Sequence, residues 1–213
     1  MTHVADPRNA PEVARLPERI WGWRFYDHFR TDSGARARLP QIGTHTPVLG
    51  NNGADLAAAI QTIREIGDAV AIDAAVDDAF PGSRIRTRCH EQGRFELEML
   101  QHGLLRPLTA DELSDGTYPL WIAALHMPRL PELLVLNEPE TSLHPDLLPP
   151  LARLIGHAAP HSQVLVVWHA TRLIAALERQ CDTHSIMPKK ALGETRIAGL
   201  HALDQPTGHW PTR

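Results

Sequence analysis

Three short segments in the second half of the chain carry residues suited to phosphate chemistry. They are Leu113–Thr117 (LSDGT), Leu133–Pro145 (LLVLNEPETSLHP) and Val164–Ala170 (VLVVWHA). Glu138 and His169 each come at the end of an apolar run that is typical of a buried parallel strand. Because ligands bind at the carboxyl ends of the strands in open α/β folds, the sequence predicts that these side chains share one edge of a sheet.

Each polar residue in these segments suits a particular task. Glu138 is suited to activating a water as general base, and Asn137 to binding a metal-coordinated water through its amide oxygen. His169 is suited to contacting a phosphate or the attacking water. Ser114 and Gly116 stand at an expected helix start, where free N–H groups and the helix dipole favour an anion.

Each feature also has an ordinary structural explanation: a turn after a strand, a surface histidine, or a helix cap. The spacing favours the functional interpretation. Ser114 and Glu138 are 24 residues apart, and Glu138 and His169 are 31 apart, so each interval fits one strand–helix unit. Together, the three segments predict phosphate chemistry.

The second half of the chain alternates between apolar strands and helical segments. We expect helices over 111–127, 145–157 and 171–180, strands over 132–136 and 162–168, and short closing strands over 184–187 and 195–203. This alternation is typical of parallel strands joined by right-handed crossovers, so it predicts an α/β fold.

The first half shows a different pattern. We expect a strand over 20–29, a loop-rich stretch over 31–52, helices over 56–65 and 68–80, and a β-hairpin formed by 83–90 and 94–101. Residues 1–19 contain three prolines and no clear period, which predicts an irregular or disordered arm.

Composition excludes several classes of protein. The chain has 213 residues, of which 43% are hydrophobic and 22% charged, and its net charge is −4, so it is neither disordered throughout nor globally basic. No apolar run reaches the roughly 18 residues that a membrane helix needs, and no secretory signal is evident. Cys89 and Cys181 are too few for a disulfide framework and have no evident activating neighbours. We therefore expect a cytoplasmic protein that does not associate with membranes.

The motifs resemble the second half of an ABC-type ATPase head, and most closely the RecF/OLD-like AAA-family ATPases, which are relatives of the SMC and RecF DNA-repair heads. The resemblance implies an α/β P-loop NTPase fold of the ABC-ATPase head type, incomplete, with a helical and β-hairpin insert. It divides the chain into an irregular arm (1–19), the strand, helical and hairpin insert region (20–108), and an α/β subdomain with the signature, Walker B and switch-histidine motifs (109–213).

The resemblance also implies roles for individual residues. Ser114, Asp115 and Gly116 would contact the γ-phosphate of an ATP held by the other protomer. Glu138 and His169 would be catalytic, as the base and the switch histidine, and Asn137 and Glu138 would bind Mg²⁺ weakly. Thr141, Ser142, Leu143 and His144 would form a loop that crosses the dimer interface. The implied cofactors are ATP and Mg²⁺, and the implied partners are a second copy or an intact ATPase head, with DNA as a further candidate.

Two departures from the family pattern matter. Asn137 stands where the Walker B motif normally has an aspartate, so affinity for Mg²⁺ should fall. No G-x-x-x-x-G-K-[ST] motif occurs, and the nearest glycine cluster, residues 50–53, lacks the lysine and the hydroxyl. The strand that normally carries this loop is central in the sheet. We therefore expect a vacancy beside Leu133–Leu136 and bare apolar faces.

Three explanations for the missing loop stay open: a truncated or wrongly started reading frame, a degenerate and inactive remnant, or a chain that offers its signature face to an intact head. The function implied is ATP hydrolysis at a head-to-head dimer interface, with DNA repair as a candidate process. Because the phosphate loop is missing, the chain alone is expected to be inactive. The alternative is a non-catalytic pseudo-ATPase module that pairs with an intact head.

Other residues favour structural explanations. His157 and His161 are separated by Pro160, which argues against an aligned metal site despite thirteen histidines in the chain. The basic residues of the expected hairpin indicate a strand face exposed to solvent, and contact with nucleic acid is the alternative. These residues are Arg84, Arg86, Arg88 and Arg94. Trp21 and Trp23 are expected on one strand face, in the core or an interface rather than as a base-stacking platform.

Overall fold

The computed structural model describes residues 11–27, 29–191 and 194–197. The chain divides into two units, Met1–Cys181 and Asp182–Arg213. The second unit contains a two-stranded antiparallel hairpin of β8 (Pro188–Ala191) and β9 (Glu194–Ile197). All the sequence motifs described above lie in the first unit.

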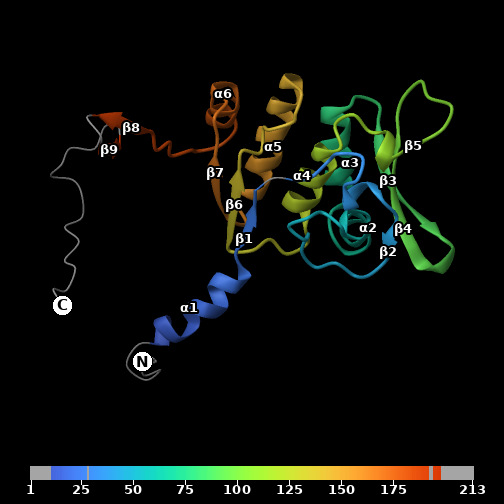
Figure 1. Ribbon diagram of the computed structural model, residues 1–213, viewed down its shortest axis with the longest axis horizontal. Coiled ribbons are helices and arrows are strands. Elements are labelled where there is room, and N and C mark those ends of the chain that lie inside the picture. Colours follow the sequence, from blue (N-terminus) through green and yellow to red (C-terminus); the bar gives the residue numbers. More distant parts are fainter. Residues whose placement is uncertain (1–10, 28, 192–193, 198–213) are drawn as a thin grey trace. The chain divides into compact units, whose positions relative to one another are not determined.

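A parallel sheet organises the C-terminal part of the first unit (Figure 1). Its strands are, in spatial order, β1 (Arg24–Tyr26), β6 (Leu133–Asn137) and β7 (Gln163–Val167). Val135 lies between Phe25 and Leu165 in the register, so apolar side chains form a row across all three strands. Since the strands are parallel, their carboxyl ends meet at one edge.

Three helices belong to this part of the unit: α4 (Thr117–His126), α5 (Leu148–Ala158) and α6 (Thr171–Gln180). The sheet residues Tyr26, Leu134 and Leu136 are almost completely buried and belong to the same core as the inner sides of these helices. The rings of Tyr26 and Phe29 pack against the indole of Trp121, which attaches β1 to α4.

A second, antiparallel sheet lies in the insert region. Its strands are β2 (Gln41–Ile42), β3 (Arg84–His90), β4 (Arg94–Leu100) and β5 (Leu108–Thr109), and β4 pairs with each of the other three. One face, with Ile85, Leu97 and Met99, packs against α2 (Leu56–Ile66) and α3 (Ala69–Ala79). The alternation of apolar and polar residues along both hairpin strands accounts for this one-sided burial.

The local sequence determines where several of these elements begin and end. Gly67 ends α2, Asp68 caps α3 by accepting a hydrogen bond from the N–H of Ala71 (2.9 Å), and Gln92 and Gly93 take positive φ angles in the hairpin turn. The expected helices over 56–65 and 68–80, the hairpin, and the helix over 171–180 are therefore confirmed, with boundaries within a residue or so.

Other predicted boundaries were wrong. Residues 11–22 form a helix, α1 (Pro11–Gly22), in place of an irregular arm and the start of a strand, because Leu16 and Ile20 recur at helical spacing. Trp21 therefore lies on this helix, 84% exposed, and does not share a strand with Trp23.

Two expected helices are shorter than predicted. The segment 111–127 contains a short 3₁₀ turn (Ala110–Glu112) and then α4, because Leu113 takes an extended conformation between them. The helix expected from residue 145 begins as a 3₁₀ turn (Pro145–Leu147) before α5. Residues 184–187 are not in a strand, and the strand lies later in the sequence, as β8 (Pro188–Ala191). Residues 198–203 of the last expected strand lie outside the described residues.

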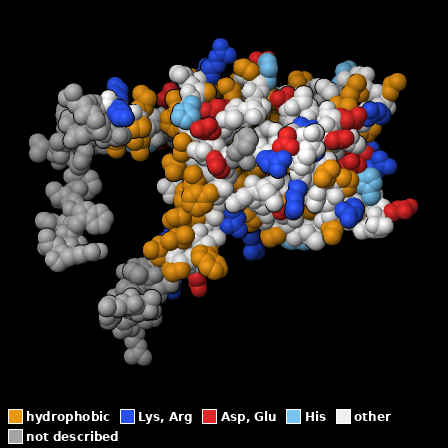
Figure 2. Space-filling view, in the orientation of Figure 1, with side chains coloured by type: hydrophobic (Ala, Val, Ile, Leu, Met, Phe, Trp, Pro, Cys, Tyr) orange, Lys and Arg blue, Asp and Glu red, His pale blue; other side chains and the backbone are white. Residues whose placement is uncertain are grey.

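The predicted vacancy beside Leu133–Leu136 is also wrong. Strand β6 is paired on both sides, so the open edges among the described strands of this sheet belong to β1 and β7. The expected bare apolar face is present, since Phe25 is 51% exposed, Leu165 51% and Val167 42%. Figure 2 shows hydrophobic side chains gathered over these strands and the adjoining end of α1. No helix in the described part of the chain has both the length and the apolar character to cross a membrane.

Candidate functional site

Two of the residues that the sequence singled out meet at the carboxyl edge of the parallel sheet. The Nε2 atom of His169 lies 3.0 Å from Oε1 of Glu138. The backbone N–H of Glu138 donates to the carbonyl of Val167 (2.7 Å), so pairing between the two chain segments continues past the end of β6. Both side chains remain accessible, with Glu138 42% and His169 78% exposed. A carboxylate beside an imidazole at an open edge can accept a proton from a bound water.

The turn after β6 contains two strained backbone positions. Glu138 has φ of 46° and Ser142 has φ of 67°, although neither is a glycine. The left-handed region costs a non-glycine residue roughly 1–3 kcal/mol, and such strain concentrates at functional sites. The N–H of Thr141 donates to the carbonyl of Glu138 (2.9 Å), which closes the turn and aims the Glu138 side chain out of the sheet edge toward His169.

Asp27 is a site residue that the sequence argument missed. It follows β1 directly, and its Oδ1 accepts a hydrogen bond from Nδ2 of Asn137 at 2.6 Å. The neighbouring strand thus provides the carboxylate that Asn137 lacks. The signal in the sequence was an acidic residue directly after the apolar end of a strand, but only the sheet order shows that β1 lies beside β6.

The oxygen atoms at the carboxyl ends of these strands are of the type that binds Mg²⁺. They are the carboxylates of Asp27 and Glu138 and the amide oxygen of Asn137. Within the described ranges, no group of three or more His, Cys, Asp or Glu side chains is arranged to hold a metal ion. Mg²⁺ sites in proteins commonly use one or two carboxylates and complete the coordination shell with water and substrate phosphates.

Glu140 is a second residue that the sequence argument missed. Its Oε1 accepts hydrogen bonds from the backbone N–H groups of His169 (2.7 Å) and Ala170 (3.0 Å). Its other oxygen, Oε2, is buried and has no hydrogen-bond partner. The carboxylate borders a pocket of about 470 Å³ whose lining includes Leu148, Thr171 and Arg172.

The signature-like turn lies elsewhere in the first unit. Gly116 is the N-cap of α4, and Ser114 contacts only its neighbour Asp115 (Oγ to Oδ2, 3.4 Å) among the described hydrogen bonds. Thr117 contacts Thr31 (3.4 Å between hydroxyl oxygens). No described hydrogen bond or ion pair joins Ser114, Asp115 or Gly116 to Glu138 or His169. Of the three predicted segments, the structure thus connects two, and the role of the third stays a prediction.

The predicted interface segment has one anchored and three accessible residues. Leu143 is half-buried and packs against the core, whereas Thr141, Ser142 and His144 are exposed. His144 accepts a hydrogen bond from the backbone N–H of Asp146 (3.3 Å), which caps the 3₁₀ turn before α5. The exposed residues are therefore held on a defined turn next to Glu138.

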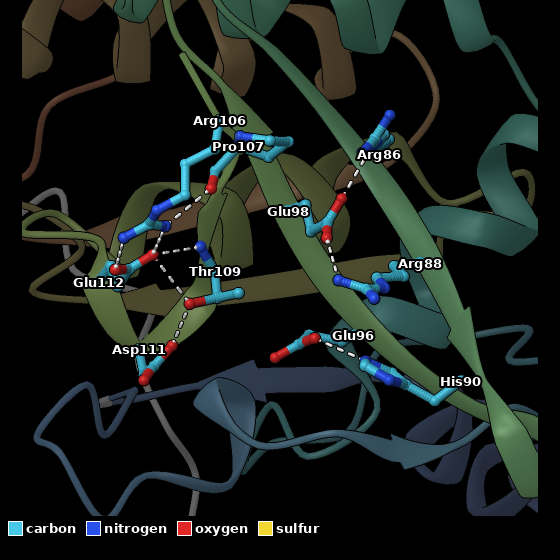
Figure 3. Close-up of polar contacts among 10 residues, drawn as sticks. All are labelled: Arg86, Arg88, His90, Glu96, Glu98, Arg106, Pro107, Thr109, Asp111 and Glu112. Carbon is cyan, nitrogen blue, oxygen red and sulfur yellow. Dashed lines mark hydrogen bonds and ion pairs between the residues drawn. The ribbon is translucent and has the colours of Figure 1, made fainter. Parts of the chain in front are cut away.

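Two of the four arginines of the hairpin, Arg86 and Arg88, share one acidic partner (Figure 3). Arg86 and Arg88 both contact the carboxylate of Glu98, at 2.8 and 3.3 Å, and the Glu98 side chain is only 4% exposed. His90 lies 2.6 Å from Glu96 across the same pair of strands. For Arg86 and Arg88 this pairing favours the structural explanation over contact with nucleic acid, whereas no described ion pair involves Arg84 or Arg94.

The same view shows how the segment before the signature-like turn is fixed. Arg106 holds both carboxylate oxygens of Glu112 (2.7 and 2.6 Å), and Thr109 completes a capping box with Glu112. The Arg106 guanidinium, together with the backbone of Thr109, lowers the pKa of Glu112 to about 2.

Three histidines form a cluster that the sequence did not predict. The rings of His126 and His157 stack at 4.6 Å with an interplanar angle of 12°, and His161 contacts His157 edge-on at 6.4 Å. Burial lowers the pKa of His126 to about 4, and the neighbouring His157 adds to this shift. His126 is therefore neutral near pH 7, with Nδ1 3.2 Å from the carbonyl of Ile122.

Comparison with known proteins identifies one family. The family model described as "AAA domain, putative AbiEii toxin, Type IV TA system" matches residues 5–175. No curated protein matches the chain.

Several solved structures share the fold. One, from a study of ATP-driven dimerization and DNA-stimulated activation of SMC ATPases, is 14% identical with a TM-score of 0.52. A Pyrococcus yayanosii Smc head with a coiled coil and joint is 15% identical with a TM-score of 0.52. An SmcHead bound to the C-winged helix domain of ScpA is 12% identical with a TM-score of 0.51.

The alignments cover 67%, 67% and 77% of this chain, and 87%, 28% and 52% of the three structures. At these identities the likeness shows the fold alone. The predicted fold class, a P-loop NTPase of the ABC-ATPase head type, is thereby confirmed.

Proposed function

Because the chain belongs to this AAA-domain family and is an AAA/ABC-type ATPase domain, we propose that it forms part of a composite ATP site at a head-to-head dimer interface. The observation that carries the proposal is the 3.0 Å contact between Glu138 and His169 at the carboxyl ends of the parallel strands. An acid–imidazole pair at the carboxyl ends of the strands suits hydrolysis of a phosphoanhydride better than a purely structural role, because solvent reaches both side chains, with Glu138 42% and His169 78% exposed.

Each residue of the edge has a task in this proposal. Glu138 accepts a proton from the attacking water, and His169 contacts the γ-phosphate and orients Glu138. Asp27 and Asn137 would hold Mg²⁺ through its bound waters. When bound, the metal supplies positive charge that neutralises the phosphate oxygens.

The signature-like turn acts on a different nucleotide. Ser114, Asp115 and Gly116 would present hydroxyl and N–H groups to the ATP of the other protomer. In this division of labour, one protomer contributes two separate faces to two sites. The exposed residues Thr141, Ser142 and His144 would lie between the protomers.

A phosphate loop is still required. The sequence has no G-x-x-x-x-G-K-[ST], so the loop would come from an intact head that pairs with this chain, and this chain alone should turn over little or no ATP. A role on DNA follows only from the SMC-like fold and is the least supported part of the proposal. The pairing of Arg86 and Arg88 with Glu98 does not favour it.

A second candidate is a pseudo-ATPase module that binds an intact head without catalysis. It is favoured by Asn137, which replaces the usual carboxylate of the Walker B motif. The two candidates make opposite predictions about Glu138: catalysis requires its carboxylate, whereas a binding module does not.

The experiment is Mg-ATP turnover by the chain mixed with a phosphate-loop-containing head of the same family. Glu138→Gln should lower the turnover that depends on the chain by at least about a hundredfold, the scale of general-base catalysis. Glu178→Gln, an exposed charge-matched control on α6, should leave it unchanged. Equal turnover with and without Glu138→Gln contradicts the catalytic proposal. Binding to the head with no ATP binding by calorimetry supports the module.

A further inference from the structure

The loop that carries His169 has few backbone restraints of its own. Strand β7 ends at Val167 and α6 begins at Thr171, so residues 168–170 belong to neither element. Ala170 is the N-cap of α6 and has no side chain that could cap the helix. The N–H groups of His169 and Ala170 therefore need an acceptor from elsewhere.

Glu140 is that acceptor. One carboxylate oxygen receives both N–H groups, at 2.7 and 3.0 Å, across 29 and 30 residues of sequence. A negative charge is favourable here because the N-terminus of a helix carries partial positive charge. The bonds are charge-assisted, which makes them stronger than bonds between neutral groups.

The orientation of this carboxylate has a cost. Its Oε2 is buried without a partner, and leaving a buried acceptor unsatisfied costs roughly 1–3 kcal/mol. The chain tolerates this cost while Oε1 makes two bonds to the His169 loop.

Glu140 also lies between the site and the interface segment. Its carbonyl accepts the N–H of Leu143 (3.1 Å), within the same turn in which Thr141 bonds Glu138. A displacement of the segment 141–144 would therefore reach the His169 loop through Glu140.

We propose that Glu140 is a positioning residue, which holds the His169 backbone so that the imidazole reaches Glu138 and couples this pair to the segment 141–144. The proposal rests on the proposed function only in giving the Glu138–His169 pair a catalytic purpose. The geometric claim itself requires no nucleotide.

The test is NMR of the full chain labelled with ¹⁵N and ¹³C. In Glu140→Ala, amide exchange of His169 and Ala170 should become about tenfold faster, the equivalent of one lost hydrogen bond. In Glu140→Gln, which keeps a neutral acceptor, the increase should be about threefold. Glu178→Ala, which removes an exposed glutamate from α6, should leave both rates unchanged.

A second readout separates positioning from simple capping. Glu138→Gln should change the ring ¹⁵N shifts of His169 in the parent, and this response should disappear in the Glu140→Ala background because the two side chains no longer meet. If the response persists undiminished, Glu140 does not position His169 and the proposal is wrong. If Glu140→Ala does not fold, the same comparison is made in Glu140→Gln, where the response should be reduced and a full response again overturns the proposal.

The outcomes for function are distinct. If Glu140→Ala abolishes the response of the His169 ring, but no mixture of the chain with an intact head hydrolyses ATP, the proposed function is wrong and the positioning role stands. Turnover that requires Glu138 but is unaffected by Glu140→Ala, together with an intact ring response, refutes positioning and keeps the function.

Discussion

The two sheets of the first unit differ in how completely they satisfy their own surfaces. In the antiparallel sheet, Leu97 and its neighbours are buried against helices, and on the opposite face Glu98 is enclosed by Arg86 and Arg88. In the parallel sheet, one face is buried but Leu165 and its row remain half exposed, and the polar residues gather at the strand ends. The antiparallel sheet of the insert thus pairs its buried charge and buries one apolar face. The parallel sheet, which carries the candidate site, leaves a row of apolar side chains exposed.

This difference suggests how the molecule divides its tasks. Parallel sheets are normally covered on both faces, whereas antiparallel sheets can leave one face to water. The antiparallel sheet therefore needs no second cover, although Ile42 on its edge strand is 66% exposed. The parallel sheet has the form of a surface to which further protein is added, as a composite ATP site would require.

The largest expected effect comes from placing the same charge on each sheet. Leu97→Lys should cost about 5 kcal/mol or prevent folding, because it buries an unpaired ammonium in the core. Leu165→Lys should cost no more than about 0.5 kcal/mol, because that position is half exposed on an edge strand. Urea unfolding followed by circular dichroism measures both. Comparable losses in the two variants would show that the exposed row is covered in solution, and the contrast between the sheets would fail.

A slightly smaller effect tests the buried face of the parallel sheet. Trp121→Ala should cost about 4 kcal/mol, because the buried indole packs edge-on against the rings of Tyr26 and Phe29. Trp121→Phe should cost only about 1 kcal/mol, since it keeps a ring and removes an indole N–H that has no partner. Calorimetric melting temperatures give the comparison. A large loss with phenylalanine would mean that the indole N–H matters more than the packing.

The next effect concerns pH and the helices that cover the parallel sheet. The pKa of His126 is about 4 in the folded chain, against about 6.5 when unfolded, so the unfolded chain binds the proton more readily. Stability from this group is complete above pH 6.5 and is lost as the pH falls toward 4, by up to about 3 kcal/mol.

The groups that face His126 act in both directions, since His157 lowers its pKa and Asp68 raises it. Unfolding titrations at pH 7 and pH 4.5 should show a smaller pH-dependent loss in His126→Leu than in the parent. Equal slopes would exclude His126 as the source. The carboxylates that titrate in the same range are common to both chains and cancel in this comparison.

The smallest effect concerns the compensated charges of the antiparallel sheet. Arg86→Ala and Arg88→Ala should each cost about 0.5 kcal/mol, because the remaining arginine still pairs with Glu98. The double variant should cost about 2 kcal/mol, since it leaves a buried carboxylate unpaired. A double-mutant cycle measures this non-additivity. Additive losses would show that the two arginines do not share Glu98 in solution.

The sequence predicted elements best where its pattern was long and clearly bounded. The helices over 56–65 and 171–180 have strong helical periodicity, the first helix ends at Gly67, and the hairpin has Gly93 in its turn. The pattern failed at 20–22 and 111–116, where aromatic or apolar residues fit both a strand and a helix. It also failed for the position of β6, because strand order depends on contacts between distant segments.

The candidate site was predictable in part for the same reason. Contact between Glu138 and His169 follows once both residues are placed after neighbouring parallel strands. Asp27 is 110 residues from Asn137, and no spacing rule connects them. Glu140 resembles any acidic turn residue until the fold brings the His169 loop to it. The catalytic and interface roles assigned to these residues stay predictions.

The outer edge of β7 has a practical consequence for anyone who purifies this chain. Its five residues, QVLVV, carry no charge, and no described strand uses the hydrogen-bonding groups on that side. An uncharged, apolar edge is a template on which strands of other molecules assemble. We expect concentrated preparations to form oligomers and eventually precipitate through this edge, and a single lysine at position 165 to delay it.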